Sequence, residues 1–448
     1  MRKGIIVLIF QGIMLLLVFV ALVVYSFKGG NLLIGFVIAA TLWSLILWLP
    51  FSSSDPAQPT WVKSVFQDSV ANYGGTIAII VFGAWFGKVI VDTGIAGSII
   101  KKVVELAGDK AFLTTILLVI VSTAIFTSAF GVGSVLAIGM IVLPIMFSMG
   151  VKKNIALAAY MFSVAGGMWL NIAYVSQFNV FWKVDGKAQN VYGAPGYITF
   201  ALVATAIHLV MALLFVSFWN LRNRAQIRKA WPATDVLDDI KMAPWWSFIV
   251  PFVPVVLVAV FKWQAVPSFL VGIFLGLLLT GHMSSWKKLV DTAQKTLHDG
   301  IADVGLLIGM LYGVNMFQAA AAAAAPVLKS LLGGIIPTNP WVLVIAFAIL
   351  APLAIFRGPL MVFGSGGATI AILQTVDPYS SHPWILLSLF IVFPVAIVAN
   401  TCPTQSWGMW GLSYAKVEPR TYLMTGIPWA WALALVLVPI SYLMIGRM

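Results

Sequence analysis

Two halves of this sequence repeat one another, and each copy contains apolar stretches interrupted by glycine and small polar residues. Gly83 and Gly87 recur as Gly309 and Gly313, at an offset of 226 positions. Further pairs follow in the same order at offsets of 226 to 230: Gly108 with Gly334, Ile125-Phe126 with Ile355-Phe356, and Ser176-Gln177 with Thr404-Gln405. Single glycine matches arise by chance, but a colinear series indicates a duplicated chain. The fold must therefore accommodate two related units.

The apolar stretches are long enough to cross a lipid bilayer. Residues 5–27 and 32–51 each contain the roughly 20 apolar residues that a helix needs to span the hydrocarbon core. Hydrophobic residues form 61% of the 448 positions and charged residues only 9%, which is too little polar surface for a water-soluble protein. We therefore expect an all-α, multi-pass membrane protein. The first stretch is too long for a signal-peptide core, so we interpret it as a retained span.

The net charge of +12 does not indicate nucleic-acid binding, because the basic residues lie in short loops and form no basic domain. It indicates instead how the chain is oriented in the membrane. The positive-inside rule places these loops in the cytoplasm. They contain Lys101-Lys102, Lys152-Lys153, the cluster Arg222, Arg224, Arg228 and Lys229, Lys287-Lys288, and Lys416 with Arg420. The N-terminus then lies outside, against the local preference of Arg2 and Lys3. Cys402 is the single cysteine, which excludes an internal disulfide and a cysteine metal site.

Each half is interpreted as five spans and one re-entrant hairpin. We expect a first repeat at residues 1–221, a cytoplasmic linker at 222–243 and a second repeat at 244–448. The hairpins are the apolar stretches 111–149 and 340–373, whose separate arms are too short to cross the bilayer comfortably. An odd number of spans inverts the second half relative to the first. Such inverted repeats support alternating access, because the halves can exchange conformations.

One segment of the second half is expected to divide into three pieces. These are an amphipathic stretch at 284–299, a span at 302–318, and a third piece that stands where residues 95–107 stand in the first half. The third piece consists of the alanine run 319–325 and residues 327–335. Pro326 is expected to end the helix after that run.

Four interruptions lie at repeat-related positions: the hairpin turns 127–134 and 357–367, and the breaks 171–177 and 400–406 in the spans that follow them. Broken helices expose backbone N–H and C=O groups that lipid cannot satisfy, so we expect these groups to face a cavity or ligand. Helix starts favour anions. The alternative is that glycine and serine only allow close helix packing. The candidate substrate-binding residues are Thr127, Ser128, Gly131, Gly133, Ser134, Asn171, Ser176, Gln177, Arg357, Gly364, Ser365, Gly366, Asn400, Thr401, Thr404 and Gln405.

Arg357 is the charged residue of this set, and it lies within an apolar stretch. Burying an arginine in the membrane is costly unless it is paired or hydrated. Its planar guanidinium suits a carboxylate, so we interpret it as a contact for a substrate anion. A structural bond to hairpin carbonyls and a position in interfacial water are the alternatives. Its counterpart in the first half is Thr127, so recognition of charge would be asymmetric.

Two residues are candidates for carrying a coupling proton. Asp303 stands with Asp299 near the start of a repeat span, and a buried carboxylate can bind a proton. The alternative is a helix cap or dipole partner. His208 lies in the middle of a span, where it is either a proton relay or a buried histidine satisfied by a neighbouring helix.

The order of spans, amphipathic arm, hairpin and broken span, present twice, resembles the ion transporter superfamily, and within it the gluconate, citrate and related organic-anion permeases. The resemblance rests on residues 127–134, 357–367 and 400–410, and on the stretch 412–431 that follows. It implies elevator-type transport, with hairpins and broken helices in a mobile domain and the other spans in a scaffold that is often dimeric. A Ser-Asn-Thr signature of sodium-coupled dicarboxylate carriers is absent from the hairpins, and acidic residues are scarce in the second hairpin.

The sequence thus predicts a secondary active transporter for a small organic anion in a bacterial-type inner membrane, with a carboxylate substrate and proton coupling favoured over sodium. The alternatives are a sodium/proton antiporter of the same superfamily and an anion channel. An enzyme is not expected, because no Ser-His-Asp or metal-ligand constellation occurs within the spans. No cofactor or metal is expected, and the expected partners are the anion, the coupling ion, the lipid bilayer and a second copy of the chain.

Overall fold

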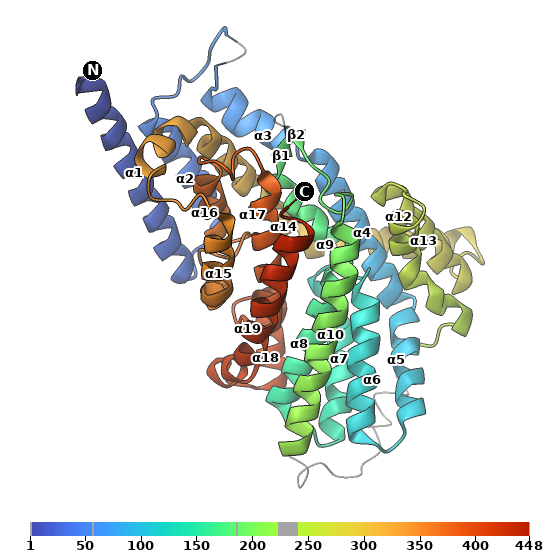
Figure 1. Ribbon diagram of the computed structural model, residues 1–448. Coiled ribbons are helices and arrows are strands. Elements are labelled where there is room, and N and C mark those ends of the chain that lie inside the picture. Colours follow the sequence, from blue (N-terminus) through green and yellow to red (C-terminus); the bar gives the residue numbers. More distant parts are fainter. Residues whose placement is uncertain (1, 56–57, 185–186, 223–240, 448) are drawn as a thin grey trace.

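The structure is almost entirely helical (Figure 1). It is a computed structural model that describes residues 2–55, 58–184, 187–222 and 241–447. The described strands β1 (Lys183–Val184) and β2 (Lys187–Ala188) form one short antiparallel hairpin. The prediction of an all-α chain is confirmed. Most of the predicted linker lies outside the described residues.

The helices follow a similar order in both halves. The first half contains α1 (Arg2–Phe27), α2 (Leu32–Ile46), η1 (Trp61–Gln67), α3 (Asp68–Ala71), α4 (Gly74–Asp92), α5 (Ile95–Ala107), α6 (Ala111–Phe126), α7 (Val132–Ser148), α8 (Lys153–Met168), α9 (Ile172–Ser176), η2 (Gln177–Phe181) and α10 (Tyr197–Arg222). The second contains η3 (Trp245–Phe252), α12 (Val253–Ala259), α13 (Ala265–Leu279), α14 (Trp286–Leu332), α15 (Pro340–Leu350), η4 (Ala351–Arg357), α16 (Gly366–Leu373), α17 (Pro383–Phe390), η5 (Pro394–Ala399), α18 (Ser406–Ala415) and α19 (Pro419–Met444).

Among the described residues, six helices are long and apolar enough to cross a membrane. A seventh span results if α8 and the α9–η2 segment, which meet at a bend of 70°, are counted as one. Other apolar helices of 10–17 residues, including α2, α13 and both arms of the first hairpin, are shorter than a straight crossing requires. These features define a multi-pass membrane protein. The short arms of the first hairpin suit an element that enters the membrane without crossing it.

The 47-residue helix α14 replaces the three pieces expected at this position, so that prediction is wrong. Pro326 lies inside α14 and removes one backbone donor. The alanines before it have the highest helix propensity, which offsets part of that cost and lets the helix continue. Residues 61–107 of the first half cover the same length but are divided among η1, α3, α4 and α5.

Matching helix caps extend the repeat beyond the motifs seen in the sequence. The hydroxyl of Thr60 accepts a 3.3 Å hydrogen bond from the backbone N–H of Lys63 at the start of η1. The hydroxyl of Ser285 accepts the equivalent 3.3 Å bond from Lys288 at the start of α14. Hydroxyl caps of this kind satisfy N–H groups that a helix start leaves free. The two copies therefore begin these segments with the same local device.

Helix α14 packs against both α2 and α4. At Gly300, an added Cβ would lie 2.9 Å from the backbone nitrogen of Trp85, so α14 and α4 approach closely there. In Figure 1, α10 descends while α19 rises toward the C-terminus, although each closes its own half. Opposite directions are what inverted halves require, and the full inverted topology stays a prediction.

Candidate functional site

The first hairpin turns between α6 and α7. Gly131 has a φ of +100°, which favours glycine, and it precedes the first residue of α7. The hydroxyls of Thr127, Ser128 and Ser134 donate to carbonyls of the same hairpin at 2.7, 3.5 and 3.0 Å. Each hydroxyl oxygen can still accept a hydrogen bond. Helix α4 lies against this turn, because a Cβ at Gly87 would come within 2.8 Å of the Phe130 backbone nitrogen.

Asn171 joins the first helix break to the first hairpin. Its Oδ1 accepts a 3.0 Å bond from the N–H of Tyr174 and caps α9. Its Nδ2 donates to the carbonyls of Phe126 and Ala129 at 3.0 and 2.9 Å. The amide is buried, and all of these bonds are internal to the protein. In this conformation Asn171 therefore holds the turn in place.

The second hairpin turns at the end of η4 through two residues with positive φ, Phe356 at +56° and Arg357 at +61°. Such angles are uncommon outside glycine and need support from their surroundings. The Arg357 carbonyl accepts bonds from the Ser26 hydroxyl at 2.8 Å and from the Ser365 N–H and hydroxyl at 2.9 and 3.2 Å. These bonds hold the turn.

The second break contacts the second hairpin as the first break contacts the first. The N–H of Phe356 donates to the sulfur of Cys402 at 3.4 Å, and that sulfur lies 3.1 Å from the hydroxyl oxygen of Thr404. At Gly364, an added Cβ would lie 2.3 Å from the Arg357 carbonyl oxygen, so only glycine fits without movement. Each turn is thus positioned by the broken helix of its own half.

The side chain of Arg357 is half-buried, and no ion pair between described residues includes it. The contacts that hold this hairpin come from its backbone carbonyl. One alternative was that the Arg357 guanidinium bonds to hairpin carbonyls. The bonds that hold the turn instead use the Arg357 backbone carbonyl. A half-buried, unpaired cation in this position remains a candidate for contact with an anion.

The hairpins also contact the breaks of the opposite half. Phe363 of the second hairpin lies among Tyr174, Phe178 and Phe181 of the first break, with ring centroids 6.5, 5.0 and 6.1 Å apart. Trp410 of α18 lies over Gly139 of the first hairpin, where an added Cβ would clash at 2.5 Å. The two turns and two breaks therefore form one connected cluster, as their repeat-related positions suggested.

Tyrosine hydroxyls satisfy carbonyls that were expected to face a ligand. Tyr197 donates to the carbonyl of Trp169 at 2.8 Å, and Tyr422 donates to that of Asn400 at 2.6 Å. A third bond, 2.9 Å long, joins Tyr192 to the Leu170 carbonyl. The expectation of free carbonyls is wrong at these positions, because neighbouring helices supply donors. Tyr197 and Tyr422 stand 225 positions apart, close to the offset of the other repeat pairs, although neither tyrosine belongs to a motif visible in the sequence.

His208 lies between Trp169, at the end of α8, and Asn400 of the second break. Its Nδ1 accepts a 3.0 Å bond from the indole N–H of Trp169, and its ring is fully buried. The neutral ring then carries its proton on Nε2, which lies near Asn400, although neither Nε2 nor Asn400 Oδ1 completes a hydrogen bond. These contacts favour the structural alternative, a buried histidine held by neighbouring side chains.

The remaining candidates differ in how they are engaged. The Ser176 hydroxyl is buried without a partner, whereas that of Thr401 donates to the Ile397 carbonyl at 2.7 Å. Gln177 is buried, and its carbonyl accepts a bond from Tyr73 at 3.1 Å. Thr404, Gln405 and Gly366 lie in the second break and hairpin, with Thr404 and Gln405 half-buried.

Asp303 approaches the first hairpin from α14. A Cβ at Gly133 would lie 2.1 Å from its Oδ2, so this position accepts only glycine without a shift of Asp303. Lys88 of α4 forms an ion pair with Asp303 at 3.5 Å. No group of three or more His, Cys, Asp or Glu side chains that could hold a metal ion occurs among the described residues.

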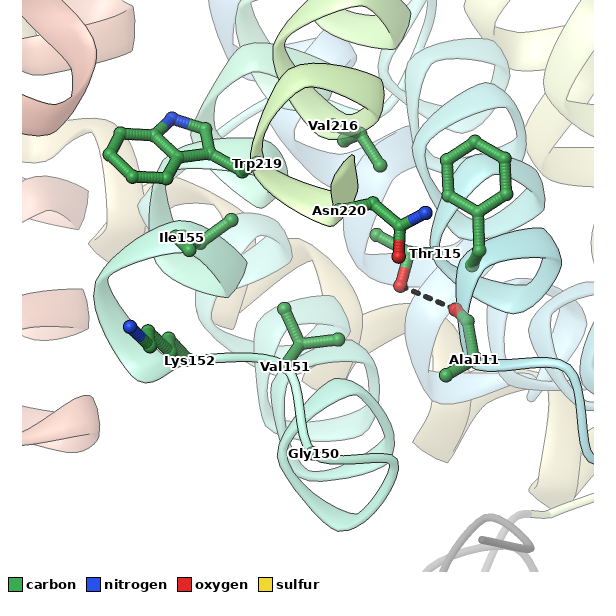
Figure 2. Close-up of a pocket in the computed structure, with 10 residues that line it drawn as sticks. Ala111, Thr115, Gly150, Val151, Lys152, Ile155, Val216, Trp219 and Asn220 are labelled. Atoms are coloured by element: carbon green, nitrogen blue, oxygen red, sulfur yellow. Dashed lines mark hydrogen bonds between the residues drawn. The ribbon is translucent and has the colours of Figure 1, made fainter. Parts of the chain in front are cut away.

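A surface pocket lies away from this cluster, where α6, α8 and α10 meet the turn after α7 (Figure 2). Its lining is apolar apart from Thr115, Lys152 and Asn220, and Thr115 donates a 2.8 Å bond to the Ala111 carbonyl. None of the candidate substrate-binding residues lines it. It is therefore distinct from the predicted site.

The chain is therefore a multi-pass, helical membrane protein in which two hairpins contact two broken helices. No protein-family model and no curated protein matches the sequence. The fold is shared with the crystal structure of the YdaH transporter from Alcanivorax borkumensis, which was described as having an unusual topology. The match covers 93% of this chain and 98% of that one, with a TM-score of 0.58 and 14% sequence identity.

Proposed function

We propose that this chain is a secondary active transporter that moves a small organic anion, with a carboxylate favoured, across a membrane. The observation that carries the proposal is the single cluster formed by both hairpin turns and both helix breaks. Each turn bonds to the break of its own half, the second turn packs on the first break, and α7 of the first hairpin contacts α18, which follows the second break. Non-helical backbone at membrane depth is tolerated where protein or a ligand covers it. A fold shared with a solved transporter supports the same function.

The charges of the cluster favour an anion over a cation. The turns 127–134 and 357–367 contain no acidic residue, while Arg357 supplies a half-buried positive charge. The hydroxyls of Thr127, Ser134 and Ser365 donate to hairpin carbonyls, and their oxygens can accept a hydrogen bond from a hydroxyl group of the solute. The favoured substrate is therefore a small carboxylate.

We further propose an elevator mechanism in which the hairpins and broken helices move together, with inverted halves at 1–221 and 244–448. The contacts that join the four segments support movement as one body, and the opposite directions of α10 and α19 support inversion. Proton coupling, a homodimer and residence in a bacterial-type inner membrane complete the proposal.

Purified protein in liposomes tests the proposal. A thermal-shift screen against small organic acids would identify a stabilising anion, and liposomes preloaded with that anion should then show trans-stimulated counterflow of its labelled form. Flux without trans-stimulation would indicate a channel. Sodium-dependent proton movement without any organic anion would indicate an antiporter, and either result would overturn the proposal.

A further inference from the structure

Five charged side chains alternate in sign along the facing sides of α4 and α14. Lys295 pairs with Asp92 and, at 3.4 Å, with Asp299, while Lys88 pairs with Asp303 at 3.5 Å. Lys88 and Asp92 are one turn apart on α4, and the three α14 residues follow one another at four-residue steps, so each set shares a helix face. We call these five residues the charge ladder. Its side chains range from 64% exposed at Lys295 to 16% at Lys88.

The inner end of the ladder lies against the first hairpin. The carboxylate of Asp303 faces the backbone N–H of Gly133, which favours its negative charge. The buried Oδ2 atom does not complete a hydrogen bond. Lys88 directly follows Gly87, the residue that lets α4 approach Phe130 in the same hairpin. The Lys88–Asp303 pair is therefore placed where the proposed substrate cluster begins.

We propose that Lys88 is a cationic contact for the substrate anion and that Asp303 competes with the anion for it, so that proton binding and anion binding are coupled. This inference rests on the proposed function and specifies its site. Ionised Asp303 neutralises Lys88 and faces the Gly133 N–H. Protonated Asp303 no longer neutralises Lys88. A substrate carboxylate then binds the Lys88 ammonium and the Gly133 N–H in its place.

Charge balance at the Lys88–Asp303 pair favours the coupling, and Arg357 adds the same positive charge to every state. The empty pair has one positive and one negative charge. With anion bound and Asp303 protonated, the pair and its anion again sum to zero, because the substrate supplies the negative charge. Anion bound without the proton makes the loaded site one charge more negative than the empty site, and a difference in charge between the two states is expensive to move through a medium of low dielectric. One proton should therefore accompany each monovalent anion, and transport should be electroneutral.

The surroundings of Asp303 favour a proton over sodium as the coupling ion. The charged groups of the ladder around Asp303 are Lys88 and Asp92 on α4 and Asp299 and Lys295 on α14, and α7 contains no charged residue. The other acidic, basic and histidine residues of α14 are Lys287, Lys288, Asp291, His298 and Lys329. The Lys88 ammonium already occupies the cation position beside Asp303, so a sodium ion would meet like charge. Asp299 and Lys295, one and two turns before Asp303 on α14, lead toward the surface, where Lys295 is 64% exposed.

A ligand-free experiment tests whether Asp303 exchanges a proton. Infrared spectra of the wild type should contain a protonated-carboxyl band that disappears as the pH is raised and is missing in Asp303→Asn. Lys88→Gln should change the pH at which the band disappears. Asp377→Asn is the matched control, because it neutralises the acid of the exposed Lys329–Asp377 pair. A spectrum unaltered by Asp303→Asn would overturn the inference.

Transport of labelled gluconate and lactate, monovalent hydroxy acids of two sizes, tests the coupling. Asp303→Asn should retain counterflow but lose accumulation driven by a pH gradient, and Lys88→Gln should lower counterflow at least about tenfold. Accumulation that persists in Asp303→Asn, or counterflow unaffected by Lys88→Gln, would overturn the inference while leaving the proposed function intact. If the wild type transports neither acid, nor any anion from the screen, the proposed function itself fails.

Discussion

The hydroxyl of Tyr422 donates a hydrogen bond of 2.6 Å to the carbonyl of Asn400, at the point where the second broken helix ends. Tyr197 makes the equivalent bond to Trp169 in the first half. Tyr422→Phe and Tyr197→Phe should each lower the free energy of unfolding by about 1–3 kcal/mol, because a buried carbonyl loses its donor. Thermal unfolding in detergent measures the loss. Tyr25→Phe, which removes an exposed 3.2 Å bond, is the control, and losses equal to the control would contradict the capping role.

Asn171 combines a helix cap with two bonds to the first hairpin, and two substitutions separate these roles. Asn171→Asp keeps an oxygen for the Tyr174 N–H but removes both donors and places negative charge against the carbonyls of Phe126 and Ala129. It should lower transport and stability more than Asn171→Ser does. Counterflow rates and unfolding temperatures of the two variants provide the comparison. If Asn171→Asp resembles the wild type, the hairpin is positioned by other contacts.

Gly133→Ala should place a methyl group on the carboxylate of Asp303 and displace it from the first hairpin. Pairwise coupling then predicts that the stability loss is smaller when Asp303→Ala is already present, which a double-mutant cycle measures. Gly305→Ala adds the same methyl group to α14 where nothing lies within 4 Å, and it serves as the control. Strictly additive effects of the two substitutions would show that residues 133 and 303 do not touch.

Arg357→Gln should raise the half-saturating anion concentration more than about tenfold, because a charge-assisted contact is lost. The fold should persist, since the backbone carbonyl of Arg357 makes the structural bonds of the turn. Lys416→Gln neutralises another cation at positive φ, outside the cluster, and is the matched control. Concentration-dependent uptake by liposomes measures both variants. An unchanged half-saturating value would remove Arg357 from the site.

Burial, with Lys241 and Lys288 nearby, lowers the pKa of His282 from its ordinary value of 6.5. This residue lies in the turn between α13 and α14, where its ring nitrogens contact the Lys241 ammonium at 3.2 Å and the Thr280 hydroxyl at 2.8 Å. The folded state therefore favours the neutral ring. The contribution of neutral His282 to the free energy of unfolding is fully present above pH 6.5. It is lost as the pH falls from 6.5 toward the folded-state pKa. Unfolding temperatures between pH 7 and 5 should consequently fall less in His282→Gln than in the wild type. His298→Gln, at an 83% exposed side chain, should follow the wild type, and identical slopes in all three proteins would refute the assignment.

The helical class and the positions of the hairpin turns and breaks could be predicted because they depend on local signals. Gly131 and Gly364 interrupt long apolar runs, and lipid permits such interruptions only where protein or ligand covers them. The partners of the exposed backbone groups could not be predicted, because they depend on which helices become neighbours. Tyr422 and Lys88 are examples, since nothing local to either residue indicates that it faces Asn400 or Asp303. The continuity of α14 through Pro326 is not evident from the proline itself, because it depends on the high helix propensity of the alanines before it.

The equal lengths of residues 61–107 and 286–332 conceal a difference in stiffness. The first-half segment contains a joint at Gly94, which has a φ of +83° and ends the hydrogen-bonded path from α4 to α5. The second-half segment is a continuous rod, and bending it would break backbone bonds that lipid cannot replace. If the hairpins and broken helices move together as proposed, we expect the first-half segment to bend at Gly94 and the second-half segment to stay straight. The two copies would then contribute unequally to transport, one as a hinge and the other as a rigid support.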